Sequence, residues 1–366
     1  MAKILHLVGP NYCGKTMLAY GLARKAQMLG LRACYVKPVY VAKFEFGRQD
    51  VGDADSLTMR EALGLSVDVD LLAPVALPER YLELTEKERA NAIERLKRVF
   101  EKLADSFDLI LAEGYGPPET FSRIGLGAPD VARAIGAQVI FVAGCKGEYM
   151  IDRIADQVEL YASFFEERGV KLGGVILNAV SAYALERAET SVRRRVEELG
   201  VEFLGAIPEM SFVLSPTARE IAQVLEAEVL WGHERLGNVI EEMVAGVLSV
   251  GTLLRWLRKA GNAVVIVGGD RPDLLVAALE ARPGLVVATE GVRPEAAVIS
   301  KAKEVEVPLL LTKMSTLEAI ERVREAQRVI APESLKLKEE AIVGAIERHI
   351  AWRRLLGDQP LGARPS

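Results

Sequence analysis

The chain has 366 residues, of which 50% are hydrophobic and 27% are charged, and its formal net charge is -5 at pH 7. This composition excludes disordered and fibrous proteins, and the acidic balance without a basic face argues against nucleic acid as a ligand. At roughly 100–200 residues per domain, the length predicts two domains. The three widely spaced cysteines cannot form a disulfide framework or a four-thiolate zinc site, so we expect a reducing, cytoplasmic compartment.

No apolar run reaches the ~18–20 residues that cross a bilayer, so we expect no membrane partner. The opening residues MAKILHLVG lack a small-residue cleavage site and predict a β-strand and not a signal peptide. His6 alternates with apolar neighbours in this strand, and we interpret it as a packed residue of the sheet.

Short β-like runs alternate with amphipathic helical segments over the first part of the chain, which is typical of a parallel sheet covered on both faces. Strands are predicted at residues 4–8, 33–36, 109–112, 139–143, 174–177 and 203–207. Helices are predicted at residues 15–29, 86–104, 150–168 and 182–199. We therefore expect a complete α/β domain over residues 1–215.

Pro208 and Pro216 interrupt this pattern, which then restarts on a smaller scale. Helices are predicted at residues 236–247, 251–259, 273–281, 295–304 and 316–327, and strands at 263–267, 285–288 and 309–311. These elements predict a second α/β domain with a three-stranded sheet over residues 217–330. A closing helix from Glu333 is predicted within the segment 331–356, and residues 357–366 are expected to form a loose tail.

The most informative stretch is GPNYCGKT, residues 9–16, which fits the pattern G-x-x-x-x-G-K-[ST] between a predicted strand and a predicted helix. Glycines allow the tight turn that points backbone N–H groups at phosphate oxygens, and the helix N-terminus adds favourable partial charge. We expect Lys15 to reach the β- and γ-phosphates and the Thr16 hydroxyl to coordinate Mg²⁺. The predicted nucleotide contacts are Gly9, Asn11, Tyr12, Cys13, Gly14, Lys15, Thr16 and Met17.

Further short motifs follow this loop in a fixed order. They are KPV at residues 37–39, DAD at 53–55, AEG at 112–114, GGVILN at 173–178 and GAIP at 205–208. In this order the set resembles dethiobiotin synthetase and the related amidating synthetases of cobyrinic acid, over residues 1–215. The phosphate loop is common to many families, whereas the ordered combination is far more specific. The resemblance implies a P-loop NTPase-type fold with ATP and Mg²⁺ as cofactors.

The resemblance also implies a metal site. Asp55, or its neighbour Asp53, would bind Mg²⁺ together with Glu113 and Thr16, because hard oxygen ligands suit this ion. Glu113 ends a buried strand, at the edge where α/β sheets bind ligands. The residues alone also allow Asp53 and Asp55 to belong to a solvated loop without a metal.

Three further roles are implied by the same resemblance. Lys37 would lie near the γ-phosphate or an acidic substrate and neutralise charge during transfer, so Lys15 and Lys37 are the catalytic candidates. Asn178 would hydrogen-bond the adenine edge, and Pro208 would lie in the base-binding loop.

The second half of the chain resembles the DRTGG domain. The resemblance rests on the motifs GVLS at residues 246–249, GDR at 269–271, TEG at 289–291, Arg293-Pro294 and PLLLT at 308–312. The middle glycine of the triplet that names the domain is Glu290 here. In long phosphate acetyltransferases this module follows a synthetase-like domain and looks regulatory, so this chain resembles their front part.

Candidate ligand contacts in the second domain follow its predicted strands. They are Asp270, Arg271, Thr289 and Gly291, because the carboxyl ends of parallel strands face the crevice where α/β sheets bind ligands. Asp270 could instead cap the following helix, with Pro272 in its first turn.

Two functions remain open. The first is a regulator that binds ATP and senses a small ligand, with acetyl-phosphate or acyl metabolism as the process that the resemblance suggests. The second is an ATP-dependent synthetase that activates a carboxylate or carbamate of a small acidic metabolite. Glutaminase activity is not expected because no cysteine follows Cys145, and the length argues against phosphate acetyltransferase activity. The regulator is favoured, since the second domain shows no evident catalytic group.

A homodimer is also expected, because the resembling synthetases are dimers and closed dimers are the commonest soluble assembly. Residues 229–257 are rich in apolar side chains, more than a three-stranded sheet is expected to cover. The second domain is therefore predicted to contribute to the interface, unless this stretch packs on its own sheet.

Overall fold

The computed structural model describes residues 2–42, 44–45, 48–49, 53–147, 151–245, 249–326 and 331–357. The chain forms two compact units, of which the first combines Met1–Glu209 with Glu339–Ser366 and the second is Met210–Lys338. The predicted helix ends at residues 150, 247 and 327, most of the GVLS motif and the predicted tail beyond Gly357 lie outside the described residues. No helix of the described ranges is both long enough and apolar enough to cross a membrane.

A six-stranded parallel sheet forms the centre of the first unit, in the order β10-β9-β8-β1-β7-β2. Its strands are β1 (Lys3–Val8), β2 (Ala33–Val36), β7 (Leu109–Glu113), β8 (Gln138–Gly144), β9 (Leu172–Val180) and β10 (Phe203–Pro208). All six predicted strands and their parallel arrangement are confirmed. The order places β1 between β8 and β7, so the loop after β1 lies beside the carboxyl ends of both neighbours.

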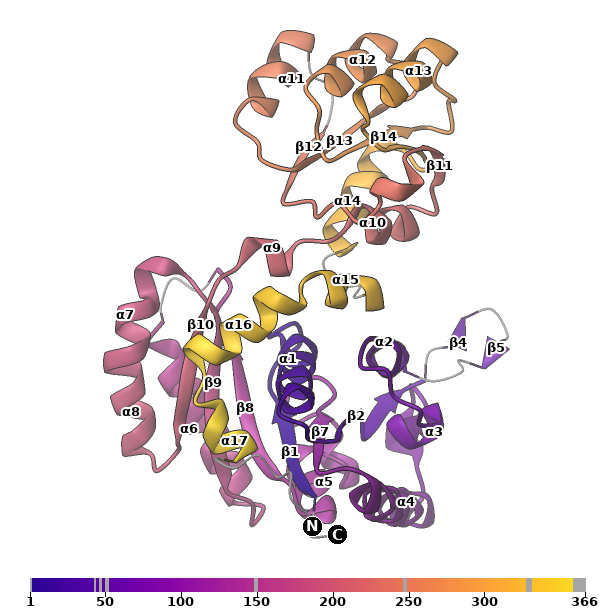
Figure 1. Ribbon diagram of the computed structural model, residues 1–366. Coiled ribbons are helices and arrows are strands. Elements are labelled where there is room, and N and C mark those ends of the chain that lie inside the picture. The colour runs from indigo at the N-terminus through magenta and orange to yellow at the C-terminus, as the bar shows by residue number, and fades with distance from the viewer. Residues whose placement is uncertain are drawn as a thin grey trace. The chain divides into compact units, whose positions relative to one another are not determined.

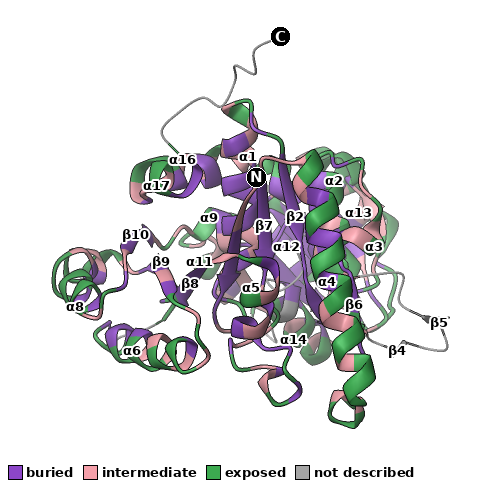
Figure 2. Cartoon of the chain, turned by 90° about the horizontal axis from the view of Figure 1, so that it is seen from below, coloured by how far each residue is buried: buried purple, intermediate pink, exposed green. Residues whose placement is uncertain are grey.

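Helices cover both faces of this sheet (Figure 1). They include α1 (Lys15–Met28), α4 (Glu86–Ser106), α5 (Ala128–Ile135), α6 (Arg153–Glu166) and α8 (Arg193–Glu198). Figure 2 shows the strands as buried, whereas the outward side of α4 is exposed. One core packs Val8 and the buried side of β8 and β9 against α5 and α6, and α1 contacts β1, β2 and β7. The aliphatic side chains of the strands are therefore removed from water, as the continuous apolar runs predict.

Smaller elements complete the first unit. They are β3 (Val39–Val41) paired with β6 (Val75–Leu77), β4 (Phe44–Glu45) paired with β5 (Arg48–Gln49), α2 (Ala54–Ala62) and α3 (Val69–Leu72). The helix predicted over 182–199 stays helical but is divided into a 3₁₀ turn (Ala182–Ala184), α7 (Leu185–Arg187), a π turn (Ala188–Val192) and α8. The π turn keeps Ala188 and Val192 buried, together with Val196 of α8, so packing sets the local winding.

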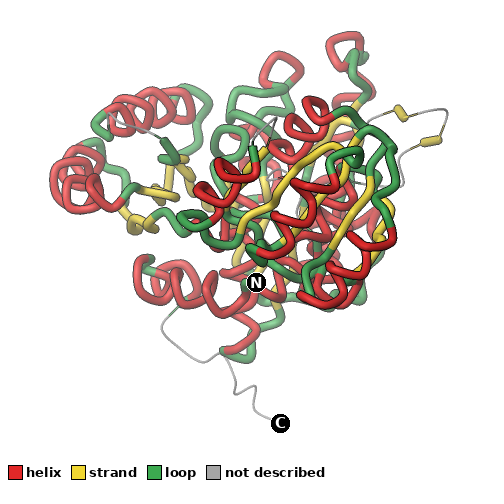
Figure 3. The backbone as a smooth tube through the Cα atoms, turned by 90° about the horizontal axis from the view of Figure 1, so that it is seen from above, coloured by secondary structure: helices red, strands yellow, loops and turns green. Residues whose placement is uncertain are grey.

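The second unit is a five-stranded sheet in the order β11-β15-β14-β13-β12, with helices on both sides (Figure 3). Its strands are β11 (Glu228–Trp231), β12 (Glu242–Ala245), β13 (Ala263–Gly268), β14 (Leu285–Thr289) and β15 (Leu309–Leu311). Its main helices are α10 (Ala218–Val224), α11 (Val250–Leu257), α12 (Pro272–Glu280), α13 (Ala296–Val305) and α14 (Thr316–Ala326). Only β11 runs antiparallel to its neighbour. The α/β class predicted for this part is confirmed.

The predicted helix over residues 236–247 is wrong, because this segment contains strand β12. Four consecutive residues of β12 pair in parallel register with β13, from Glu242 opposite Ala263 to Ala245 opposite Ile266. The apolar spacing fits a helix and a strand equally well over so few residues, and the pairing with a buried strand decides between them. With β12 and with β11, a strand that was not predicted either, the sheet has five strands and not the predicted three.

This correction removes the physical reason given for an interface at residues 229–257. The stretch itself supplies β11, β12 and α11, and Leu236, Val239, Ile240, Val244 and Leu253 are buried within the unit. Among the described large apolar residues of the stretch, Trp256 is the one that is mainly exposed, at 58%.

The single closing helix predicted from Glu333 is also wrong. The structure has three helices, α15 (Pro332–Leu337), α16 (Glu339–His349) and α17 (Trp352–Leu356). The chain leaves α16 because its backbone pairs with the edge strand β10: Ile350 bridges Gly205, and the Ala351 N–H donates to the Leu204 carbonyl at 2.7 Å. This pairing covers part of an otherwise open sheet edge. Figure 1 shows α16, in yellow, packed against α1, in indigo.

We predict that Gly205→Ala detaches the C-terminal segment from β10. Gly205 has a φ of 136°, and a Cβ there would lie 1.9 Å from the His349 carbonyl oxygen. Backbone strain and overpacking together predict a loss of about 2–4 kcal/mol in the free energy of unfolding, measured by urea titration. Gly200→Ala is the matched control, since Gly200 also has a positive φ (72°) but open space around it. We expect it to cost about 1 kcal/mol. Equal costs for the two variants would refute the crowding argument.

Candidate functional site

The predicted phosphate loop lies between β1 and α1, as the motif requires. Gly14 precedes α1 in the left-handed region, with φ 92° and ψ 21°. A Cβ at this position would lie 2.1 Å from Nδ2 of Asn178. Glycine is therefore needed here both for the turn and for the close approach of β9.

The side chains at the start of α1 are held by the loop and by β7. Lys15 is buried, and its ammonium donates to the carbonyl oxygens of Gly9 at 2.9 Å and Pro10 at 2.7 Å. The Thr16 hydroxyl donates to Oε1 of Glu113 at 3.0 Å. The ammonium is thus already folded over the loop, where phosphate oxygens would be stronger acceptors than carbonyl oxygens.

Glu113 is the acceptor around which the other side chains are arranged. It is 3% exposed, and Oε1 accepts from Thr16 and lies 3.4 Å from the Lys37 ammonium, while Oε2 accepts from the Tyr35 hydroxyl at 2.9 Å. Lys37 also forms an ion pair with Asp55. Burial opposes the charge on Lys37, but the surrounding carboxylates, Glu113 first, raise its pKa above the usual value and keep it protonated.

The two aspartates of the DAD motif have different surroundings. Asp53 caps α2 by accepting from the Ser56 N–H at 2.9 Å and from its hydroxyl at 3.1 Å. Burial raises the pKa of Asp53 to about 6, and Lys37 works against this rise. Asp55, on the first turn of α2, faces Lys37. Both carboxylates thus have protein partners, and their role as metal ligands stays a prediction.

The oxygen atoms present here suit Mg²⁺, but they do not form a complete metal site. Within the described ranges, no three His, Cys, Asp or Glu side chains are grouped to hold a metal ion. Magnesium commonly binds through one or two carboxylates, with phosphates and water completing its shell. The neighbouring oxygens of Thr16 and Glu113 fit that pattern, and the predicted ligands Asp53 and Asp55 lie near Lys37 on the same side.

Asn178, on β9, lies against the phosphate loop. Its side-chain amide donates to the Cys13 carbonyl at 2.9 Å, and its backbone carbonyl accepts from the Cys145 N–H at 2.8 Å. Pro208 is the last residue of the neighbouring strand β10. Their proposed adenine contacts stay predictions, as do the contacts of Asn11, Tyr12 and Met17.

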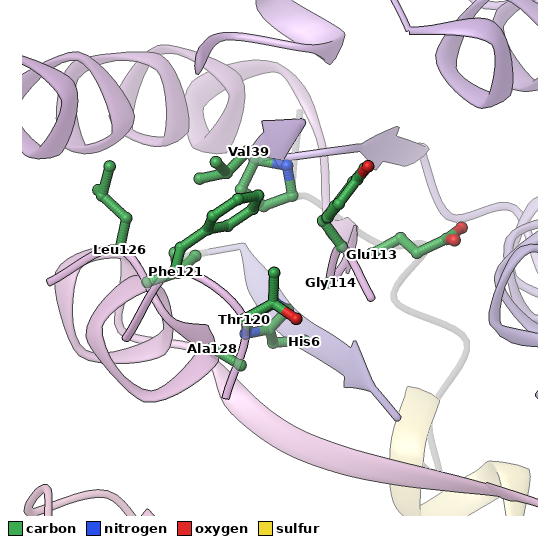
Figure 4. Close-up of a pocket in the computed structure, with 11 residues that line it drawn as sticks. His6, Val39, Glu113, Gly114, Thr120, Phe121, Leu126 and Ala128 are labelled. Carbon is green, nitrogen blue, oxygen red and sulfur yellow. The ribbon is translucent and has the colours of Figure 1, made fainter. Parts of the chain in front are cut away.

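A small pocket adjoins this arrangement (Figure 4). It measures about 260 Å³ with its open mouth included, and Glu113 and Gly114 lie on its wall. Neither this pocket nor the contact of Tyr35 with Glu113 was predicted from the sequence. Tyr35 and Lys37 stand two residues apart and both reach Glu113, so the period of two along a strand is the signal that could have identified this tyrosine.

The candidate residues of the second unit lie at the carboxyl ends of β13 and β14, and three of them bond to neighbouring residues of the same unit. The Thr289 hydroxyl lies 2.7 Å from that of Thr316, and Arg271 pairs with Asp273 at 2.9 Å. Glu290 accepts from the Thr316 N–H at 2.9 Å, at the start of α14. The Gly291 N–H donates to the Thr312 carbonyl at 2.9 Å.

The alternative role of Asp270 as a helix cap is wrong. The N-cap position of α12 is Arg271, and no side chain caps that end of the helix. The Asp270 carboxylate instead lies close to Gly268, where a Cβ would be only 2.5 Å from its Oδ1.

A family model described as an AAA domain matches residues 11–217, more than half of the chain. The chain belongs to this AAA domain family. A second model, the DRTGG domain, matches residues 220–326. The AAA domain thus carries the phosphate loop, Glu113 and Asn178, and the DRTGG domain carries the five-stranded sheet.

Curated relatives resemble either the whole chain or its AAA domain. The phosphate acetyltransferase of Nitratidesulfovibrio vulgaris is 26% identical over 317 residues, which are 82% of this chain and 44% of the relative. The ATP-dependent dethiobiotin synthetase of Clostridium perfringens strain 13 is 24% identical over 233 residues, 62% of this chain and 99% of the relative. The chain spans about half the length or less of the phosphate acetyltransferases that it matches. The predicted resemblance to both families is confirmed.

Two solved structures show a distant likeness. The CBS and DRTGG domains of the Clostridium perfringens pyrophosphatase, complexed with diadenosine tetraphosphate, match with TM-score 0.29 and 20% identity, covering 32% of this chain and 51% of that one. The MinD cell division protein of Aquifex aeolicus matches with TM-score 0.35 and 18% identity, covering 58% of this chain and 84% of that one. At these scores the fold rests on the strand order described above.

Proposed function

We propose that this protein binds Mg-ATP in its AAA domain and that its DRTGG domain senses a small ligand and regulates acyl metabolism. The proposed nucleotide site is supported by one observation, the arrangement of four side chains at the ends of β1 and β7: Lys15, Thr16, Lys37 and Glu113. Lys15 would bind the β- and γ-phosphates, and Lys37 would neutralise charge near the γ-phosphate. The resemblance to phosphate acetyltransferases supports the link to acyl metabolism.

Mg²⁺ would be held by Thr16 and Glu113, with Asp53 or Asp55 nearby. When bound, the ion supplies positive charge to the phosphates. The protein's own part is to orient Glu113, which Tyr35 and Lys37 do by donating to its two oxygens. Asn178 would meet the adenine edge, and Pro208 would lie beside the base.

The covalent path of the chain supports a regulatory role. The chain leaves the first unit after Glu209, one residue beyond Pro208, and returns to it at Glu339. Glu339 accepts from the Tyr20 hydroxyl at 2.6 Å and from Arg24 at 2.8 Å, both on α1. Because α1 begins with Lys15 and Thr16, both connections join elements of the proposed nucleotide site. A ligand bound in the second unit could thereby bias nucleotide binding through these two connections.

The second candidate function is an ATP-dependent synthetase that activates a carboxylate or carbamate. The pocket beside Glu113 favours it, since this pocket adjoins the proposed phosphate site. A thermal-shift screen of metabolites with and without Mg-ATP separates the two functions. An acid that stabilises the protein only together with nucleotide supports the synthetase.

We also propose a homodimer, on the resemblance to dimeric synthetases and no longer on the apolar stretch. The chain mass is 39.9 kDa, so light scattering at micromolar concentration should give twice this value. A mass near 40 kDa with and without Mg-ATP would refute the dimer.

We predict that Lys15→Ala weakens Mg-ATP binding by about 100-fold or more, because a charge-assisted contact to phosphate is lost. Calorimetry measures the affinity, and circular dichroism checks that the fold is retained. Lys97→Ala removes a lysine from the exposed side of α4 and should leave the affinity unchanged. Unchanged affinity in Lys15→Ala would sink the nucleotide assignment.

We predict that Glu339 couples the two units. In the unchanged protein, Mg-ATP should slow amide hydrogen exchange in α1 and α16 and alter it in the second unit. Glu339→Ala removes the acceptor of Tyr20 and Arg24, so the nucleotide effect should stay within the first unit. The control is Glu347→Ala, also on α16, which removes a more exposed pair with Lys25. Nucleotide effects in the second unit that persist in Glu339→Ala would contradict this route.

A further inference from the structure

The two buried lysines of the site have different partners. Among the described contacts, Lys15 donates to backbone carbonyl oxygens of the phosphate loop and pairs with no carboxylate. Lys37 instead forms ion pairs with Asp55 and Glu113. A ligand phosphate would therefore meet one ammonium that lacks a counter-charge and one that must first leave its carboxylates.

The Lys37 ammonium uses the oxygens that a metal ion would need. Oε1 of Glu113 lies 3.4 Å from this ammonium and accepts from the Thr16 hydroxyl at 3.0 Å. Thr16 and Glu113 are the oxygen ligands that fit Mg²⁺ here, and Asp55 is a further carboxylate on the same side. A metal ion that used Oε1 would have to share this oxygen with Lys37. Two positive charges so close together repel each other, and burial strengthens the repulsion.

The site is open to ions from solution on one side. The Asp55 side chain is 35% exposed, whereas those of Lys37 and Glu113 are 8% and 4% exposed. A dissolved cation can thus reach the outer carboxylate. What opposes its binding is therefore the charge of Lys37 and not a closed wall.

The site keeps its shape when the Lys37 ammonium changes partners. The Tyr35 hydroxyl donates to the other oxygen of Glu113, Oε2, at 2.9 Å, so this carboxylate stays oriented without Lys37. The Lys37 backbone is held separately, because its N–H donates to the Leu72 carbonyl at 2.7 Å. The four-carbon stem of a lysine is flexible, so the ammonium can move while its backbone stays in place.

We propose that Lys37 occupies the cation position of this site in the absence of nucleotide and yields it to Mg²⁺ only when a phosphate group accepts its ammonium. Lys37 is thus an internal counter-ion that prevents the protein from binding a divalent cation alone. Metal and nucleotide bind cooperatively, because each favours the arrangement in which Lys37 has left Glu113 and Asp55. The phosphate step rests on the proposed nucleotide function, whereas the exclusion of the metal is tested without nucleotide.

The test titrates the full chain with Mn²⁺ as a stand-in for Mg²⁺, without nucleotide, and measures the free metal by electron paramagnetic resonance. The unchanged protein should bind Mn²⁺ weakly, with a Kd of about 1 mM or higher. Lys37→Met keeps the reach of the side chain but removes its charge, so Mn²⁺ should bind about tenfold or more tightly. Circular dichroism checks the fold of this and every other variant.

Three further variants show whether charge at this position is the cause. Lys37→Arg keeps the positive charge and should leave Mn²⁺ binding as weak as in the unchanged protein. Lys25→Met removes a lysine in the last turn of α1, where it pairs with Glu347 at 2.5 Å, and should also leave binding weak. Glu113→Gln added to Lys37→Met should abolish the gain, because it removes the carboxylate that Lys37 guards.

Two results would overturn the proposal. One is Mn²⁺ binding by the unchanged protein with a Kd of about 10 μM or lower, which needs no variant. The other is equal Mn²⁺ affinity in the unchanged protein and in Lys37→Met. Mg-ATP affinity is measured by calorimetry on the same samples. Mg-ATP binding without an effect of Lys37→Met on Mn²⁺ contradicts this proposal alone, whereas absent Mg-ATP binding contradicts the proposed nucleotide function.

Discussion

The buried carboxylate of Glu113 is the group on which the geometry of the AAA domain site depends. Thr16 comes from α1, Tyr35 from β2 and Lys37 from the segment after β2, and all three meet the same side chain at the end of β7. A charged carboxylate at 3% exposure is stable only when its oxygens accept such bonds. Satisfying Glu113 therefore fixes the first turn of α1 relative to β7, and with it the position of Lys15.

The same requirement explains how the acidic and basic groups divide their roles. Lys37 is shared between Glu113 and Asp55, so its charge is balanced before any ligand binds. Lys15 has only carbonyl oxygens and the Cys13 sulfur as acceptors, and no carboxylate pairs with it among the described contacts. The Lys15 ammonium is thus buried at a helix N-terminus without a counter-charge among the described residues. This imbalance is what an anionic ligand would relieve.

Sequence patterns predicted the parts of this structure that local signals determine. The glycine spacing before α1 and the apolar runs of the six strands are of that kind, and both are confirmed. The patterns failed where distant pairing decides. Residues 242–245 form a strand because β13 is available as a partner, and the C-terminal helix breaks after His349 because Gly205 and Leu204 bond to its backbone. The pocket at His6 depends on Phe121 and Leu126, more than a hundred residues away, so no spacing could indicate it.

The two units treat the carboxyl ends of their strands in opposite ways. In the AAA domain, Lys15 has no carboxylate partner among the described contacts, whereas in the DRTGG domain Arg271 pairs with Asp273 and Thr289 bonds to Thr316. Glu290, which stands in place of a glycine of the domain's name, accepts from the Thr316 N–H at the first turn of α14, so its carboxylate satisfies a backbone donor that this helix end leaves open. The side chain thereby ties the end of β14 to the start of α14. A ligand can regulate such a domain only by favouring one arrangement of its elements over another, and the bond of Glu290 stabilises the arrangement seen here.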